Sequence, residues 1–252
     1  MPLRREELSR DYSREEAEVS LTAIKAEMER ISDPDDARFL QRFFKTGPRQ
    51  YGKGDVFRGI RVPATRQVLR KFPDVTVATA GKLLRSKYHE DRLLALLMLI
   101  RRFQRGDAAA QKKIYELYLA NTKYINNWDL VDLSAEHIVG GYLLERSRAP
   151  LTRLARSSLL WDRRISILAT FHFIRAGEFD ETLRVAEMHL ADSEDLMHKA
   201  VGWMLREVGN RSPLVLREFL RKHYKVMPRT MLRYAIEKFP VRERKKYLEG
   251  RI

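Results

Sequence analysis

The sequence predicts an all-α protein, an α-solenoid of paired antiparallel helices with a basic concave face. Apolar side chains recur at helical period along nearly all of the 252 residues, and the alternation typical of strands is scarce. Beyond residue 75 the helix-sized segments also repeat at a constant spacing. We expect one domain with three parts: N-terminal helices and a Gly-rich loop over 1–74, helical repeats over 75–240, and a basic C-terminal tail over 241–252.

The sequence of the N-terminal part, residues 1–74, predicts three helices and one loop. Ser13 and Glu16 have the spacing of a capping box, which marks the start of the first helix. Pro63 suits the first position of the third helix, because its missing N–H needs no partner there. The stretch between the second and third helices combines several Gly residues with a Pro, which is typical of a loop. We expect the helices over 13–30, 33–44 and 63–72, and the loop over 45–55.

Five helix pairs are expected in the repeat region. Arg92, Trp128, Arg164 and Lys199 each open the apolar part of a second helix, at steps of 36, 36 and 35 residues. A helix–turn–helix unit of that length favours a HEAT-like solenoid, with an irregular helical bundle as the alternative. First helices are expected over 77–85, 108–120, 151–158, 181–190 and 213–223, and second helices over 90–103, 125–144, 161–175, 195–208 and 229–239.

The composition points to an anionic partner. Lys and Arg number 49 against 34 Asp and Glu, a net charge of +15. Nucleic acid is the first candidate, an anionic membrane surface the second, and a charge without functional use the third interpretation. The absence of Cys excludes disulfides, zinc-finger cysteines and thiol nucleophiles. No signal peptide or membrane-length apolar run occurs, so we expect a soluble intracellular protein.

Residues 126–132, Asn-Asn-Trp-Asp-Leu-Val-Asp, predict a site at the start of a second helix. Trp128 and Asp132 are four positions apart and so share a helical face. The repeat register places Arg164 opposite Trp128 and Trp203 roughly opposite Asp132. Each residue also has a plain structural interpretation, as a core Trp, a helix-dipole carboxylate or a salt-bridge partner. Their coincidence in the register favours a site.

Other motifs are weaker. The six His residues lack the spacing of a metal site, so we expect neither metal nor cofactor. The Gly-rich loop matches no nucleotide-binding fingerprint, but it carries Lys45, Arg49 and Lys53, and its backbone N–H groups are suited to phosphates. The basic run 242–246 is more typical of a solvated helix face than of a specific contact.

Four strings together resemble the bacterial AlkD-type DNA alkylation repair glycosylases, a family of HEAT-like-repeat proteins. Two of them, WDLVD at 128–132 and KAVGWMLRE at 199–207, are specific to the family, whereas FRGIRVP at 57–63 and WDRR at 161–164 are supportive. The resemblance extends over about 38–238. It implies a monofunctional enzyme that hydrolyses the N-glycosidic bond of cationic alkylpurines, chiefly 3-methyladenine and 7-methylguanine, in double-stranded DNA.

The resemblance also implies which residues act. The family's catalytic Asp falls on Asp132, its site tryptophans on Trp128 and Trp203, and its site Arg on Arg164, where it would bind a phosphate beside the lesion. No Lys is placed as a Schiff-base nucleophile, so the expected product is an abasic site without strand cleavage. Further contacts with the DNA backbone are expected from Lys199, Arg206, Arg163, Lys45 and Lys53.

Two departures from the family's best-known form keep alternatives open. That form has a second Trp directly before the first, where this chain has Asn127, and its loop is shorter than residues 47–55 here. The alternatives are a binder of branched or damaged DNA without efficient excision, and a scaffold for protein or RNA. We expect a monomer in the bacterial cytoplasm, associated with the nucleoid when bound to DNA.

Overall fold

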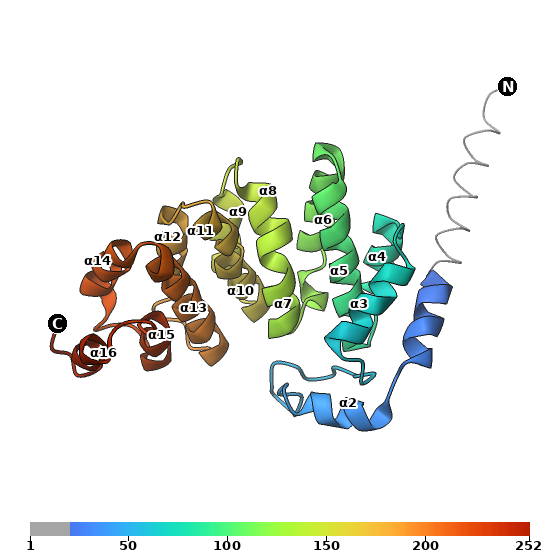
Figure 1. Ribbon diagram of the computed structural model, residues 1–252, viewed down its shortest axis with the longest axis horizontal. Coiled ribbons are helices and arrows are strands. Elements are labelled where there is room, and N and C mark those ends of the chain that lie inside the picture. Colours follow the sequence, from blue (N-terminus) through green and yellow to red (C-terminus); the bar gives the residue numbers. More distant parts are fainter. Residues whose placement is uncertain (1–20) are drawn as a thin grey trace. The chain divides into compact units, whose positions relative to one another are not determined.

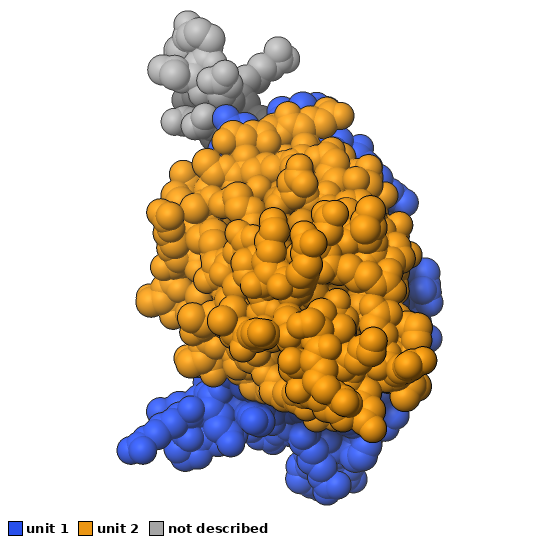
Figure 2. Space-filling view, turned by 90° about the vertical axis from the view of Figure 1, so that its left-hand side faces the viewer, with its two compact units in different colours: residues 1–130 blue, residues 131–252 orange. Residues whose placement is uncertain are grey.

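The structure is a computed structural model that describes residues 21–252. The chain divides into two compact units, unit 1 over 1–130 and unit 2 over 131–252 (Figure 2). Helices make up all the regular structure of the described residues, and the only β-pairing there is an isolated bridge between Val56 and Tyr88 (Figure 1). The all-α prediction is therefore confirmed. The expected start of the first helix at Ser13 lies outside the described residues.

Unit 1 is organised around one long helix, α5 (His89–Arg105). Helices α3 (Val62–Lys71), α4 (Val77–Leu83) and α6 (Ala108–Leu119) pack against it. The apolar run of α5 is buried on every side, as expected for the central helix of the unit. The other helical segments of the unit are residues 21–30, α2 (Pro34–Gln41), the short η1 (Thr122–Tyr124) and the first turn of α7 (Trp128–Ala135).

The string FRGIRVP fixes the N-terminal helices to α5. The carboxylate of Glu90 accepts the backbone N–H groups of Arg58, Gly59 and Ile60 at 2.9, 2.9 and 3.2 Å. Gly59 has a φ of +78°, and a Cβ there would lie 2.0 Å from the carbonyl oxygen of Asp33. Only glycine fits this close approach, so the string is required by the fold.

Unit 2 arranges its helices in two layers. In one layer α13 (Asp195–Arg211) packs between α10 (Leu160–Leu168) and α15 (Arg229–Ala235), and in the other α9 (Ala149–Ala155) packs beside α12 (Asp180–Met188). Each helix of the first layer follows its partner of the second in the chain, as the solenoid prediction requires. The remaining elements are the end of α7, a π-helix (Glu136–Gly140), α8 (Gly141–Leu143), α11 (Phe171–Arg175), α14 (Pro213–His223) and α16 (Val241–Leu248).

Two second helices of unit 2 are less regular than predicted. The expected helix 125–144 contains a π-helical turn, and the expected helix 161–175 is broken after α10. The two irregularities meet, because a Cβ at Gly140 would lie 2.2 Å from the carbonyl oxygen of Ala169. Thr170 stabilises the break by donating its hydroxyl to the carbonyl of Ile167 at 2.6 Å. The predicted tail 241–252 contains α16.

The repeat register predicted from Arg92 and Arg164 is wrong by one residue. Three Arg or His side chains lie in equivalent positions, since each donates to the backbone carbonyl six residues before it. They are Arg92 to Ser86 at 3.1 Å, Arg163 to Ser157 at 3.2 Å and His198 to Asp192 at 2.5 Å. The structural equivalent of Arg92 is therefore Arg163, and its neighbour Arg164 is free to face another way.

Arg163 is held inside unit 2 by several contacts. Besides its carbonyl partners, it donates Nε to the carboxylate of Asp192 at 2.8 Å, and its side chain is 18% exposed. These contacts close the turn before α10, which is a structural role. A DNA contact by Arg163 stays a prediction.

Candidate functional site

Asp132 on α7 and Arg164 on α10 form a bidentate ion pair within unit 2. Both contacts, Nε to Oδ1 and Nη2 to Oδ2, are 2.8 Å long. The remaining group, Nη1, contacts the carbonyl oxygen of Leu196 on α13. The Arg164 side chain is 5% exposed and that of Asp132 is 18% exposed, so the carboxylate alone keeps access to solvent. The partner of Arg164 is thus Asp132, whereas the register had placed Arg164 opposite Trp128.

Trp203 on α13 is half-buried and held in a fixed orientation. Its ring packs edge-on against Phe171, with the ring centroids 5.9 Å apart. Its indole Nε1–H donates to the carboxylate of Glu207, one turn later, at 3.2 Å. The guanidinium of Arg175 lies 4.7 Å from the centre of the Phe171 ring. An aromatic side chain oriented in this way, next to a ring that already contacts a cation, is suited to stack against a partly apolar ligand.

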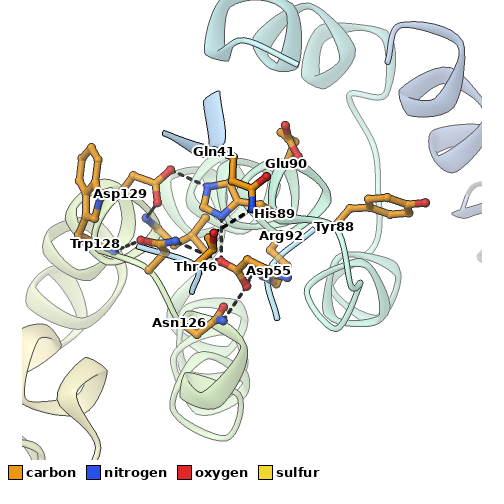
Figure 3. Close-up of polar contacts among 12 residues, drawn as sticks. Gln41, Thr46, Asp55, Tyr88, His89, Glu90, Arg92, Asn126, Trp128 and Asp129 are labelled. Carbon is orange, nitrogen blue, oxygen red and sulfur yellow. Dashed lines mark hydrogen bonds and ion pairs between the residues drawn. The ribbon is translucent and has the colours of Figure 1, made fainter. Parts of the chain in front are cut away.

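The start of α5 in unit 1 carries a buried polar network that the sequence analysis missed (Figure 3). His89 Nε2 lies 2.7 Å from Asp129 Oδ2, and His89 Nδ1 lies 3.6 Å from Asp55 Oδ2, an ion-pair distance. Arg92 Nη2 donates to Asp55 Oδ1 at 2.7 Å. The side chains of His89, Asp55 and Arg92 are 3%, 3% and 4% exposed.

The network makes His89 a cation at neutral pH. Burial by itself lowers the pKa of His89, but the carboxylates of Asp129 and Asp55 outweigh it and raise the pKa to about 9. Burial also disfavours the charged form of Asp55 and by itself raises its pKa. The contact with His89, the charge of Arg92 and two Asn amides outweigh this effect, so the pKa of Asp55 lies below its usual value. Two carboxylates and two cations therefore balance one another inside the unit.

Aromatic rings cover this network and connect it to Trp128. Phe44, at the start of the Gly-rich loop, lies 5.1 Å from the ring of Phe57, 4.9 Å from that of His89 and 5.6 Å from that of Trp128, centroid to centroid. The Phe44 and Trp128 planes are 26° apart, so the two rings stack. One face of Trp128 is thus fixed by the loop region, and the side chain as a whole stays half-exposed.

Asn127 anchors the Gly-rich loop. Its side chain is fully buried, accepts the backbone N–H of Trp128 at 2.9 Å and donates to Asp55 at 3.1 Å. Asn126 donates to the same carboxylate at 2.9 Å. The two Asn side chains therefore hold the end of the Gly-rich loop.

The other predicted DNA-binding side chains differ in their exposure and in whether they pair with an acid. Lys45 and Lys53 lie exposed on the loop. Lys199 lies 2.8 Å from Asp195 on its own helix, and 42% of its side chain is exposed. Arg206 contacts Glu237 and is 20% exposed. The loop lysines are the freest of the four.

Two further properties of residues 21–252 bear on the predictions. No helix there has the length and apolar character needed to cross a membrane. No three His, Cys, Asp or Glu side chains gather there in a way that would hold a metal ion.

Comparison with known proteins decides the family. The family described as "DNA alkylation repair enzyme" matches residues 24–239. The chain belongs to this family. A solved structure described as a predicted DNA alkylation repair enzyme from Enterococcus faecalis is 15% identical, with a TM-score of 0.65 over 83% of this chain and 97% of that one. At this identity the similarity supports the fold. No curated protein matches the sequence. Membership of the DNA alkylation repair family indicates a role in DNA repair.

A sequence signal for the missed network does exist. Four polar residues, His89 to Arg92, open α5 directly before its long apolar run, and all four are buried. Charged residues are rarely buried without partners, so a buried helix that begins with four of them predicts a network. Its partners Asp55 and Asp129 are 34 and 40 residues away from His89 in the sequence, which hides them from local analysis.

Proposed function

We propose that the protein is a DNA glycosylase that hydrolyses the N-glycosidic bond of cationic N-alkylated purines in double-stranded DNA. The observation that supports this function best is the Asp132–Arg164 pair, which presents a fixed, partly exposed carboxylate. Membership of a DNA alkylation repair family supports DNA as the substrate, and the net charge of +15 suits binding to a polyanion.

The chemistry explains how one carboxylate can be sufficient. An alkylated purine such as 3-methyladenine or 7-methylguanine carries a positive charge and leaves as a neutral base, so it needs little help from a general acid. The sugar develops oxocarbenium character, which a nearby carboxylate stabilises. Asp132 takes this role and orients the attacking water. Ordinary glycosidases need a second carboxyl group because their leaving groups must be protonated.

In this proposal Arg164 is a positioning residue for Asp132. Its three donor groups all contact protein atoms, and almost none of its surface is exposed. A bidentate guanidinium fixes both oxygens of a carboxylate and favours its ionised form. The phosphate contact implied by the family resemblance needs an exposed guanidinium, so the structure favours the positioning role.

Trp128 and Trp203 contact the sugar and backbone at the lesion in the proposed complex. Trp128 is four residues before Asp132 in α7, and Trp203 lies on α13, to whose start Arg164 is tied. Both side chains are half-buried and contact other aromatic rings, so part of each stays open to a ligand. Aromatic faces stabilise nearby cationic character.

Release of free 7-methylguanine from methylated duplex DNA tests the proposal. Asp132→Asn is expected to lower the release rate about 100-fold or more, a loss typical of removing one electrostatic stabiliser. Asp180→Asn, the same change at an exposed carboxylate on α12, is the matched control and should leave the rate unchanged. Far-UV circular dichroism and binding to undamaged duplex confirm that each variant is folded.

Each outcome decides between the hypotheses. Equal release by the wild type and Asp132→Asn would refute the role of Asp132. No release by a wild type that still binds duplex DNA would favour the non-catalytic DNA binder. Binding that does not weaken as salt rises would argue against DNA and for a protein partner.

A further inference from the structure

The surface of unit 2 carries a hollow beside α15 that the proposed active site does not use. Thr230, Arg233 and Tyr234 line it from one face of α15, Glu237 from the turn that follows, and Arg244 from α16. The volume of the hollow is about 360 Å³, which is ample for a phosphate group and its neighbouring sugar atoms.

Two guanidinium groups in the hollow have donors to spare. Arg233 is exposed and makes no ion pair within residues 21–252. The Nε atom of Arg244 is buried and has no hydrogen-bond partner among those residues. A buried, unpaired guanidinium N–H is costly, and such groups in native proteins usually have a ligand, ion or water as their partner. Planar guanidinium groups match the oxygens of a phosphate.

The one acid in the hollow is already neutralised. Glu237 contacts Arg206 of α13 and lies 3.5 Å from the ammonium of Lys238. Its pKa is lowered, because the charges of Arg206 and Lys238 outweigh the opposite effect of burial. The carboxylate is thus ionised but paired, and Arg233 and Arg244 leave the hollow positive. Tyr234 adds an aromatic side chain that is 36% exposed.

The hollow lies next to α13, the helix that carries Trp203. Gly202, next to Trp203, lets α13 and α15 approach so closely that a Cβ there would lie 2.5 Å from the carbonyl oxygen of Met231 and 2.5 Å from Tyr234 Cβ. Tyr234, which lines the hollow, therefore packs directly against α13.

We infer that this hollow binds a backbone phosphate of DNA, outside the nucleotide that is excised. The inference rests on the proposed function only in taking DNA as the ligand. Arg233 and Arg244 donate to the phosphate oxygens, and Tyr234 packs against the adjoining sugar. Such a contact sets the position of the protein on the duplex and reads no sequence, so it binds undamaged DNA as well as damaged DNA.

The salt dependence of binding to undamaged duplex DNA tests the contact. Arg233→Gln and Arg244→Gln should each weaken binding about tenfold at low salt and reduce the slope of log affinity against log salt by about 0.9. Arg221→Gln removes the same charge from an exposed position on α14 that does not line the hollow, and should leave the slope unchanged. Arg233 is exposed, so its variant keeps the fold even if that of Arg244 does not.

The possible results separate this inference from the proposed function. Variants of Arg233 and Arg244 that behave like Arg221→Gln would overturn the inference and leave excision unaffected. Unchanged DNA affinity, with loss of the thermal stabilisation given by inorganic phosphate, would assign the hollow to free phosphate and overturn the DNA contact. A wild type that binds DNA but releases no base would refute the glycosylase, whereas the effects of Arg233 and Arg244 on binding would still be expected.

Discussion

Raising the pH should destabilise the protein through one residue, His89. The pKa of this side chain is about 9 in the folded state, against about 6.5 in an unfolded chain. Because the folded state binds the proton more tightly, the stabilisation is fully present below pH 6.5 and is lost as the pH rises through 9. The difference of roughly 2.5 pKa units corresponds to about 3 kcal/mol of unfolding free energy.

The size of this effect follows from the surroundings of His89. Asp129 and Asp55 face the ring from two sides and favour its charged form, while Arg92 opposes it. Only 3% of the His89 side chain is exposed, so solvent screens these contacts little. Once His89 loses its proton, one buried carboxylate has lost a cationic partner, and the network is no longer neutral.

Urea unfolding at intervals between pH 6 and pH 9.5 measures the effect. In the wild type the free energy of unfolding should fall by about 3 kcal/mol over this range. His89→Gln should abolish that fall, because the neutral amide does not titrate. The matched control is His172→Gln, since burial lowers the pKa of His172, so the titration of this residue adds nothing to the fall in stability at alkaline pH and its variant should keep the wild-type slope. A wild-type profile that is flat, or a slope that persists in His89→Gln, would refute the reasoning.

Two further variants test the packing. Gly202→Ala places a methyl group 2.5 Å from the carbonyl oxygen of Met231, so we expect a loss of about 1–3 kcal/mol despite the better helix propensity of Ala; an unchanged melting temperature would contradict the close approach. Asp55→Ala leaves the buried Arg92 without its carboxylate, so urea unfolding should show a loss of about 3–5 kcal/mol. Asp107→Ala, which removes an exposed helix cap, should cost only about 1 kcal/mol, and equal losses in the two variants would exclude a buried ion pair at Asp55.

The helical period of the apolar residues predicted the architecture because this spacing depends only on residues close together in the sequence. The helices of unit 2 bury one face each, and the spacing of their apolar residues is visible in any short window. Breaks within helices depend on distant atoms instead. The interruption at Ala169 arises where the backbone of Gly140 comes against it, and no residue near position 169 indicates that approach.

The candidate site could be predicted in composition but not in pairing. Arg163 and Arg164 are adjacent cations, and the sequence does not say which of them closes the preceding turn. The turn takes Arg163, because only that position reaches the carbonyl of Ser157, and Arg164 is thereby directed to Asp132. A shift of one residue hardly changes the predicted repeat length, but it changes which carboxylate the guanidinium contacts.

The closed base of the Gly-rich loop makes this segment a replaceable cassette. The backbone N–H of Gly52 donates to the carbonyl of Lys45 at 2.8 Å, so the chain leaves and re-enters at almost the same place. Phe44 directly before the loop and Asp55 at its end carry the contacts with the rest of unit 1. Lengthening a loop whose ends are pinned costs only about 0.6 kcal/mol per doubling. The tip can therefore be exchanged, for an epitope, a fluorophore site or another recognition loop, while Trp128 keeps its stacking partner.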